Sequence, residues 1–364
     1  MNMTITQRIS SGTATALVLG ATVAGVTPPA VAAVELFIAD RGEDVILRFD
    51  GVSGAFVDTF ASSGALDRPV NVEFGPDGHL YVANFGDGYV LRFNGQTGAY
   101  MGIFASYSWL EETVEVLFRN GYLYALGNDH HNCVVFDDTS GTFVKEFGDP
   151  IMRYPHDMVF GPDGLLYVTT EQTTQGLVQV WDVRDYQLVD WFAPPGAISL
   201  ATGIAFGPDG HVYVCDWYDA EILRYDGQTH ELIDVFVPSG SGGLSGPSSL
   251  AFRPDGYLYV SNSNGVHRYD AQTGAFVDVF IADGTGGLDQ ARGFVFRCPE
   301  GDLDCDDDID VSDHHLLAAC LGGPGVTTAP PDCYLPVFEQ ADLDGDGDVD
   351  LGDFLELQQY FTGS

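Results

Sequence analysis

Two stretches near the C-terminus space acidic side chains as a calcium-binding loop requires. In residues 342–353 the acids occupy positions 1, 3, 5, 7 and 12 of such a loop: Asp342, Asp344, Asp346, Asp348 and Asp353. Alternating carboxylates wrap around a hard cation, and position 7 contributes its backbone carbonyl. Gly347 stands at position 6, where the loop turns sharply. This stretch therefore predicts a Ca²⁺ site.

The earlier stretch, residues 302–313, repeats the pattern with Asp302, Asp304, Asp306, Asp308 and Asp313. Asp307 replaces the glycine of position 6, and aspartate tolerates the left-handed conformation needed there. Each loop runs into a predicted short helix, at residues 314–321 and 354–361. A merely solvated acidic run is the alternative, but it does not explain why the same spacing occurs twice. We expect two bound Ca²⁺ ions.

Two loop–helix units without a leading helix, and with Asp at position 12, resemble a type I dockerin. The resemblance covers residues 300–364 and implies a small α-helical, EF-hand-like module that docks onto a cohesin-like protein partner. Such modules anchor their proteins in extracellular assemblies, commonly alongside polysaccharide-degrading enzymes. Where the family often carries Ser-Thr, this chain has Val311-Ser312 and Leu351-Gly352.

Cysteines are concentrated in the same part of the chain, at Cys298, Cys305, Cys320 and Cys333. Small modules use disulfides because their hydrophobic cores are small. Four cysteines allow three pairings, of which we favour the nearest neighbours, Cys298 with Cys305 and Cys320 with Cys333. Cys133 and Cys215 fall in predicted strands of different repeats, and we expect buried free thiols there.

The rest of the chain is a repeat. The segment FGPDGHLYVAN at 74–84 recurs at 160–170, 206–216 and 252–262, with a divergent copy at 118–127. Six phenylalanines close the units at intervals of 43 to 45 residues: Phe60, Phe104, Phe147, Phe192, Phe236 and Phe280. That period fits a four-stranded propeller blade. Within a unit, four short segments rich in Val, Phe, Tyr and Leu are separated by turn residues, as expected of strands.

Six closing strands predict an all-β, six-bladed propeller over residues 34–299. The first unit lacks its innermost strand, and residues 293–296 form an isolated copy of it after the sixth unit. We predict that this copy completes the first blade and closes the ring, which removes open sheet edges. The pattern resembles NHL-repeat propellers, a superfamily that includes lactonases and lyases. The resemblance implies architecture and leaves the activity open.

The N-terminus has the features of a secretory signal peptide, residues 1–33. Arg8 gives a positive start, residues 14–26 are apolar and uncharged, and small residues allow cleavage near Ala32 or Ala33. A membrane anchor is the alternative, but the apolar stretch is short for a spanning helix. We expect a secreted protein, extracellular or periplasmic, with a monomeric propeller.

Charge and motifs exclude several classes of function. The formal net charge is −39, so neither nucleic acid nor an anionic membrane surface is an expected partner. The aromatic content of 12% argues against disorder. The sequence contains neither a Gly-x-Ser-x-Gly elbow nor a His-Glu-x-x-His zinc motif.

Variable loops of the repeat share one face of the predicted propeller, which marks a binding face. Alignment of the innermost strands places polar residues where these strands begin: Asn71, Glu115, His156, Asp157 and Arg292. Oxygen donors with one imidazole suit a divalent cation. Hydrogen bonding with water inside the channel is the alternative. Asp40, Asn84, Asp216 and Asn262 recur just past the second strand, where we expect them to cap turns.

Aromatic residues also lie in these loops: Tyr107, Trp109, Trp217 and Tyr218. They could form a platform for a sugar or peptide, or simply cover blade edges. Lactonase-like propellers hold a channel metal with Glu, Asn and Asp, and Glu115, Asn71 and either Asp157 or Asp216 are similar in residue type. Two functions follow as hypotheses. One is a calcium-binding platform for a protein or glycan, and the other is a metal-dependent lactonase, lyase or carbohydrate-active enzyme.

Overall fold

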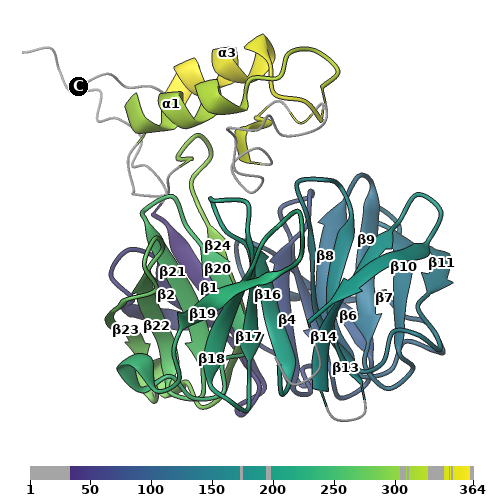
Figure 1. The fold of residues 1–364 in the computed structure, drawn as a ribbon. Helices are drawn as coiled ribbons and strands as arrows, with labels where there is room; N and C mark the ends of the chain where they lie inside the picture. The colour runs from purple at the N-terminus through teal and green to yellow at the C-terminus, as the bar shows by residue number, and fades with distance from the viewer. Residues whose placement is uncertain are drawn as a thin grey trace, which may run out of the picture. The chain divides into compact units, whose positions relative to one another are not determined.

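The computed structural model describes residues 33–172, 175–193, 198–303, 309, 311–326, 340–343, 345 and 347–360. Its strands form a β-propeller, and the described residues that follow include helices α1 (Val311–Cys320) and α3 (Leu351–Tyr360) (Figure 1). The predicted leader lies outside the described residues, apart from Ala33. Among the described residues, none of the helices combines the length and apolarity that crossing a membrane needs.

Six antiparallel sheets of four strands make up the propeller, which confirms the predicted blade number. The first blade consists, from the channel outward, of β24 (Ala291–Arg297), β1 (Glu35–Asp40), β2 (Val45–Asp50) and β3 (Phe56–Ser62). The second has β4 (Pro69–Phe74), β5 (Leu80–Asn84), β6 (Tyr89–Phe93) and β7 (Tyr100–Ala105). The third has β8 (Thr113–Arg119), β9 (Tyr122–Gly127), β10 (Asn132–Asp137) and β11 (Phe143–Phe147).

The remaining three blades follow the same order. The fourth has β12 (Pro155–Phe160), β13 (Leu166–Gln172), β14 (Gln175–Asp182) and β15 (Gln187–Phe192). The fifth has β16 (Ala201–Phe206), β17 (Val212–Asp216), β18 (Glu221–Tyr225) and β19 (Leu232–Val237). The sixth has β20 (Ser249–Phe252), β21 (Tyr257–Asn262), β22 (Gly265–Asp270) and β23 (Phe276–Ala282).

Ring closure occurs in the first blade, as predicted. Strand β24 pairs antiparallel with β1, and Leu36 lies opposite Phe296. Glu35 forms ion pairs with Arg297 on β24 and with Arg48 on β2, so one carboxylate links three strands of the blade. Because β24 pairs with β1, the innermost position of the first blade is filled and the ring has no open edge there.

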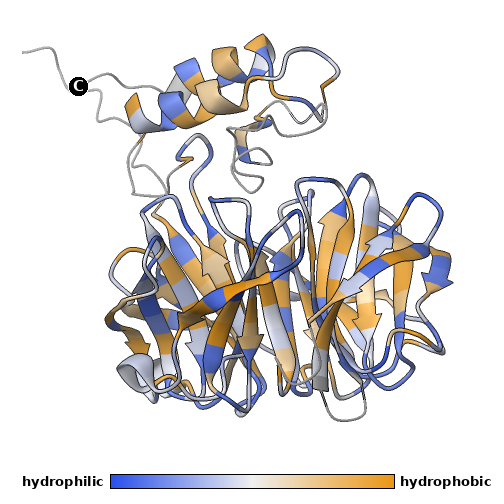
Figure 2. Ribbon diagram, viewed as in Figure 1, coloured by the Kyte–Doolittle hydropathy of each residue, from blue (hydrophilic) through white to orange (hydrophobic). Residues whose placement is uncertain are grey.

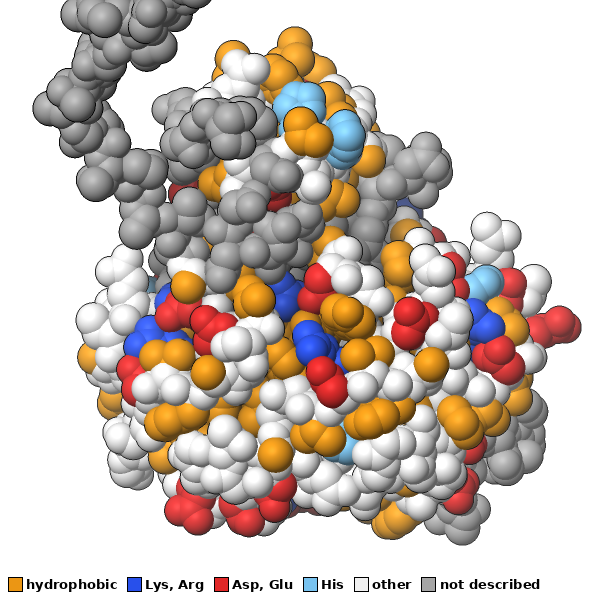
Figure 3. All heavy atoms as spheres, turned by 90° about the vertical axis from the view of Figure 1, so that its left-hand side faces the viewer, with side chains coloured by type: hydrophobic (Ala, Val, Ile, Leu, Met, Phe, Trp, Pro, Cys, Tyr) orange, Lys and Arg blue, Asp and Glu red, His pale blue; other side chains and the backbone are white. Residues whose placement is uncertain are grey.

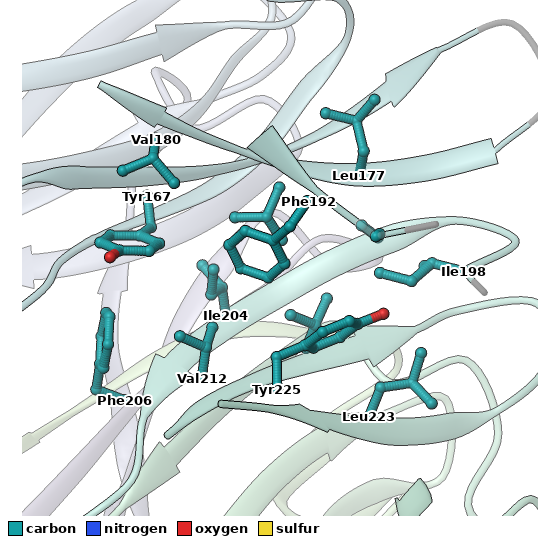
Figure 4. Close-up of a cluster of buried hydrophobic side chains, with 14 residues drawn as sticks. Tyr167, Leu177, Val180, Phe192, Ile198, Ile204, Phe206, Val212, Leu223 and Tyr225 are labelled. Carbon is teal, nitrogen blue, oxygen red and sulfur yellow. The ribbon is translucent and has the colours of Figure 1, made fainter. Parts of the chain in front are cut away.

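Blades pack on one another through a repeated aromatic cluster. The ring of Tyr167 on β13 meets the ring of Phe206, in the next blade, edge-on with centroids 4.9 Å apart (Figure 4). Tyr213 repeats this contact with Phe252 at 4.6 Å. Edge-to-face aromatic pairs stabilise beyond the area that they bury. The repeat therefore places one large ring at the junction of successive blades.

The Pro-Asp-Gly turn supports the same tyrosines. Its aspartate accepts a hydrogen bond from the hydroxyl group four residues later in four repeats: Tyr81–Asp77, Tyr167–Asp163, Tyr213–Asp209 and Tyr259–Asp255, at 2.8 to 3.0 Å. The turn glycine takes a left-handed conformation, with φ of 70° at Gly78. The constant turn sequence is thus explained by backbone geometry and by the need to satisfy a buried phenol.

Figure 2 shows hydrophobic residues along the strands and hydrophilic ones in most loops. The outermost strands are an exception, because large apolar side chains on them are exposed, among them Ile103, Trp191 and Val279. On the side where β23 lies, Figure 3 shows hydrophobic and acidic side chains intermixed.

The C-terminal module has a hydrophobic core built from two similar halves. Three core residues of the first half have counterparts 40 positions later: Leu303 and Leu343, Ile309 and Val349, Leu317 and Leu357. Helices α1 and α3 begin three residues earlier than predicted. The position-12 residues Asp313 and Asp353 therefore lie in their first turns, where a carboxylate interacts favourably with the helix dipole.

Candidate functional site

Loops at the variable face are held by buried polar side chains. Asp216, at the end of β17, accepts hydrogen bonds from the backbone N–H groups of Ser199 (2.6 Å) and Leu200 (3.2 Å), which arrive from the preceding blade. It also accepts one from Tyr218 in its own turn. The buried set consists of Asp40, Asn84, Asp216 and Asn262. The predicted capping role is confirmed, and Asp216 additionally fixes an interblade loop.

These loops surround a cavity of about 230 Å³ at the mouth of the central channel. Four of the five predicted channel residues line it, namely Glu115, His156, Asp157 and Arg292. Val70, Val114, Thr202, Ser248 and Ser249 complete much of the wall, and Arg41, Phe85 and Asn128 enter from the loops between second and third strands. Strand alignment thus identified the residues from the innermost strands.

Glu115 and Asp157 form a carboxyl pair at this cavity. The two carboxyl groups interact, since each affects the pKa of the other. Asp157 also accepts hydrogen bonds from the backbone N–H groups of Met158 (2.7 Å) and Ile204 (3.0 Å). Burial raises the pKa of Asp157 to about 7. Burial, followed by repulsion from Asp157 and Glu73, raises the pKa of Glu115 well above its usual value. The pair therefore retains a proton near neutral pH.

Nearby polar atoms are buried without hydrogen-bond partners among the described residues. They are Oδ1 of Asn71, Nε2 of His156 and Nε of Arg292. Burial, together with repulsion from Arg292, lowers the pKa of His156 to about 4, so the imidazole is neutral at physiological pH. Native proteins rarely leave such atoms unsatisfied, and water or a ligand is the usual partner.

Two arginines give the mouth a local positive charge. The guanidinium of Arg41 lies 4.6 Å from the ring centroid of Phe85, and that of Arg292 lies 4.7 Å from the centroid of Trp217. Burial and repulsion from Arg41 lower the pKa of Arg292 to about 10. Burial, followed by repulsion from Arg68, lowers the pKa of Arg41. Attraction to Glu112 raises this pKa, but by less.

The described mouth residues do not fit a divalent cation. Across the described part of the chain, no group of three His, Cys, Asp or Glu side chains is arranged to hold a metal ion. At the mouth, Asp157 accepts hydrogen bonds from two backbone N–H groups, and Arg41 and Arg292 would repel a cation. The predicted channel metal therefore gains no support from this geometry.

The predicted aromatic platform is dispersed over several contacts. Tyr107 stacks on Phe143 with centroids 4.5 Å apart, and Trp109 stacks on His130 at 6.3 Å. Trp109 and Tyr218 are exposed, whereas Trp217 packs beneath Arg292. Sequence reasoning did not single out Arg41, because only the fold brings this loop residue beside Arg292, which is 251 positions away.

Both acidic loops of the module show the same internal hydrogen bond. The N–H at position 2 donates to the carboxylate at position 12, from Leu303 to Asp313 and from Leu343 to Asp353, each at 2.6 Å. Gly347 N–H also donates to Asp342 at 3.0 Å. Five predicted ligands lie outside the described residues: Asp304, Asp306, Asp308, Asp344 and Asp346. The calcium sites accordingly stay predictions.

Cysteine chemistry agrees with the sequence where it is described. Cys133 and Cys215 are buried free thiols, as expected. Cys298 and Cys320 are each disulfide-bonded. Their predicted partners, Cys305 and Cys333, lie outside the described residues, so the pairing remains a prediction.

Comparison with solved structures shows that this propeller fold is shared. A chain of a nidogen–laminin complex matches with a TM-score of 0.59 at 14% identity, covering 72% of this chain and 98% of that chain. A Bacteroides caccae protein of unknown function gives 0.58 at 14%, covering 73% and 99%. Virginiamycin B lyase from Staphylococcus aureus gives 0.52 at 14%, covering 66% and 78%. No protein-family model and no curated protein matches the chain. At this identity the likeness shows the fold alone.

Proposed function

We propose that this chain is a secreted, calcium-binding propeller that acts as a platform for a protein or glycan and is anchored through its dockerin-like module. The observation that carries the proposal is the repeated bond between position 2 and position 12 in the two acidic loops. The same bond at the same loop position supports a common role for both loops.

The chemistry of the module suits Ca²⁺. Residues 298–364 contain 17 Asp and Glu residues and no Lys or Arg. Four of the predicted ligands are nevertheless buried: Asp302, Asp313, Asp348 and Asp353. Burying ionised carboxylates is costly unless a cation compensates them. Ca²⁺, which takes six to eight oxygen ligands, would supply that compensation.

Exposed apolar residues support the docking role. Val311 and Leu351 open α1 and α3, at the positions where the resembling family carries its recognition residues, and their side chains are 57% and 72% exposed. Leu355 is 61% exposed on the same helix as Leu351. Apolar contact with a cohesin-like protein would remove these side chains from water. Docking through this surface should therefore weaken when Leu351 becomes polar.

Calorimetric titration with Ca²⁺ tests the proposal on residues 34–364. We expect two ions per chain, one ion for Asp353→Ala, and two for the control Asp185→Ala, which removes an exposed propeller carboxylate. Loss of one ion follows because position 12 supplies a ligand that no neighbour replaces. A chain that binds no Ca²⁺, or an Asp353→Ala variant that still binds two ions, would refute the proposed module.

An enzyme at the channel mouth is a second candidate, because burial raises the pKa of both Glu115 and Asp157. A carboxyl group with a pKa near 7 suits general acid–base catalysis. Lactones and glycans are the substrate classes to screen. Glu115→Gln should reduce any turnover by about 10²–10⁴-fold, whereas Glu231→Gln, an exposed control, should not. Equal activity of the two variants would remove this candidate.

A further inference from the structure

The two arginines of the channel mouth differ from most other arginines of the propeller in how their charge is compensated. Several of the others pair with carboxylates: Arg48–Asp58, Arg184–Asp182, Arg224–Asp234, Arg268–Asp278 and Arg297–Glu35. Arg41 and Arg292 form no such ion pair within the described part of the chain. Glu115 and Asp157 line the same cavity, but burial raises the pKa of both carboxyl groups, so in mildly acidic solution the two arginines are the charged groups there.

Contact with aromatic rings leaves these guanidinium groups able to bind a ligand. Arg41 lies over the ring of Phe85 and Arg292 over that of Trp217, and such a ring occupies none of the in-plane hydrogen-bond positions of a guanidinium group. Nε of Arg292 and Nε2 of His156 are buried atoms without partners among the described residues, and both nitrogens can donate when protonated. An anion placed here would satisfy donors and relieve the repulsion between the two cations.

The size and lining of the cavity limit the classes of ligand that it can bind. Its volume of about 230 Å³ is below the roughly 300–1,000 Å³ of sites for drug-sized ligands. Ser248, Ser249 and Thr202 provide hydroxyl oxygens, while Val70 and Val114 provide apolar surface. A planar, two-oxygen anion matches the fork of an arginine, which favours a carboxylate.

We propose that the channel mouth binds the carboxylate of a small sugar acid, with Arg292 and Arg41 as anchors and the hydroxyl side chains facing the ring. The glycans bound by the proposed platform would then be ones that contain acidic sugars. The proposal refines that part of the proposed function and is independent of calcium in the module.

Titration of residues 34–364 with D-galacturonate, against D-galactose as the uncharged match, tests it in a mildly acidic buffer. We expect galacturonate alone to bind. Affinity should fall more than about tenfold in Arg292→Gln and in Arg41→Gln, because a hydrogen bond to a charged group is worth about 1.5–3 kcal/mol. Arg184→Gln is the control, since it removes the same charge from a side chain that is 83% exposed.

Competition experiments complete the test. Acetate should displace galacturonate, and sulfate should displace it less well. Equal binding of galactose, equal weakening in Arg184→Gln, or stronger competition by sulfate would each overturn the proposal. If Arg292→Gln does not fold, Arg292→Lys and Arg41→Gln give the same comparison. Calcium stoichiometry is measured on the same sample, so a failure of the acid site is distinguishable from a failure of the calcium module.

Discussion

The channel mouth and the C-terminal loops both gather carboxyl groups, yet they compensate them differently. At the mouth, burial raises the pKa of Glu115 and Asp157, Asp157 accepts hydrogen bonds from backbone N–H groups, and two arginines line the same cavity. In the loops, the carboxylates repeat at alternate positions and no Lys or Arg occurs between residues 298 and 364. The comparison teaches that acidic residues alone do not define a cation site, because the neighbouring charges decide which ion is attracted.

The two regions also differ in what stabilises the chain around them. Buried aromatic rings hold the propeller together, while the module has a small core and depends, in our proposal, on bound ions. All four tryptophans precede residue 298, so tryptophan fluorescence follows the propeller alone. Helical circular dichroism follows α1 and α3, because the described part of the propeller has no α-helix. The following predictions use these two signals.

The largest effect should come from removing an aromatic ring at a blade junction. Tyr213 is fully buried and packs against Phe236 and Phe252. Tyr213→Ala should lower the free energy of unfolding of the propeller by about 3–5 kcal/mol, whereas Tyr213→Phe should cost only about 1 kcal/mol by losing the bond to Asp209. Urea unfolding monitored by tryptophan fluorescence measures both. A loss in Tyr213→Phe as large as in Tyr213→Ala would contradict the packing argument.

Calcium removal should affect the other region. With Ca²⁺ at about 100 times its dissociation constant, each site should stabilise the module by about 2.7 kcal/mol. Chelation should therefore lower the temperature at which the helical circular dichroism signal is lost on heating. The midpoint of the thermal transition seen by tryptophan fluorescence should not change. Magnesium at equal concentration is the control, since it demands smaller octahedral sites. If chelation shifted only the transition seen by tryptophan fluorescence, the calcium sites would have to lie in the propeller and not in the module.

An intermediate effect is expected for the side chains that hold the interblade loops. Asn84 accepts a hydrogen bond from Asp67 N–H at 2.9 Å and donates one to the Ala65 carbonyl at 3.1 Å. Asn84→Ala should cost about 1–3 kcal/mol, because buried backbone groups lose their partners. Gln96→Ala, in an exposed turn between β6 and β7, should change stability by less than about 0.5 kcal/mol.

The most gradual effect is a pH dependence at the mouth, because it builds up over several pH units. In the folded chain Asp157 keeps its proton up to about pH 7, and the pKa of Glu115 is also raised. In the unfolded chain both carboxyls lose their protons near pH 4. Folding therefore takes up protons between these values, and propeller stability should fall as pH rises through this window, by up to about 1.4 kcal/mol per pH unit for each proton.

Glu115→Gln should make this decline shallower, because one of the two protons is no longer taken up. Urea midpoints from tryptophan fluorescence, measured across the window at constant calcium, give the slope. Glu231→Gln, whose side chain is exposed, should retain the slope of the parent chain. An unchanged slope in Glu115→Gln would mean that its carboxyl is ionised in the folded protein.

The sequence predicted the propeller well because its signals are local and repeated. The interval between closing phenylalanines reflects one ring per blade, and the Pro-Asp-Gly turn reflects a bond from Asp to a tyrosine four residues later. Ring closure by residues 293–296 followed from counting strands. In the module, the calcium loops stay predictions, and α1 and α3 begin earlier than expected, so that the position-12 aspartates lie in their first turns.

The site was less predictable because its chemistry depends on contacts between distant segments. Asn71, Glu115, His156 and Asp157 were found by aligning strands, yet their residue types suggested a cation. Arg41 changes that interpretation, and it belongs to a turn whose sequence carries no signal for the channel. Only the pairing of β1 with β24 brings Arg41 and Arg292 into one cavity. Which charged residues meet at the site could therefore be learned only from the structure.

Closure of the ring by β24 also has a mechanical consequence. The chain leaves β24 at Arg297 and continues directly into the segment that contains the module. If the module is tethered, tension along the chain reaches β24 first and pulls it parallel to β1. A strand loaded along its length must break several ladder bonds together. The ion pair between Arg297 and Glu35 stands at the loaded end, so the blade that completes the ring would also bear the force of anchorage.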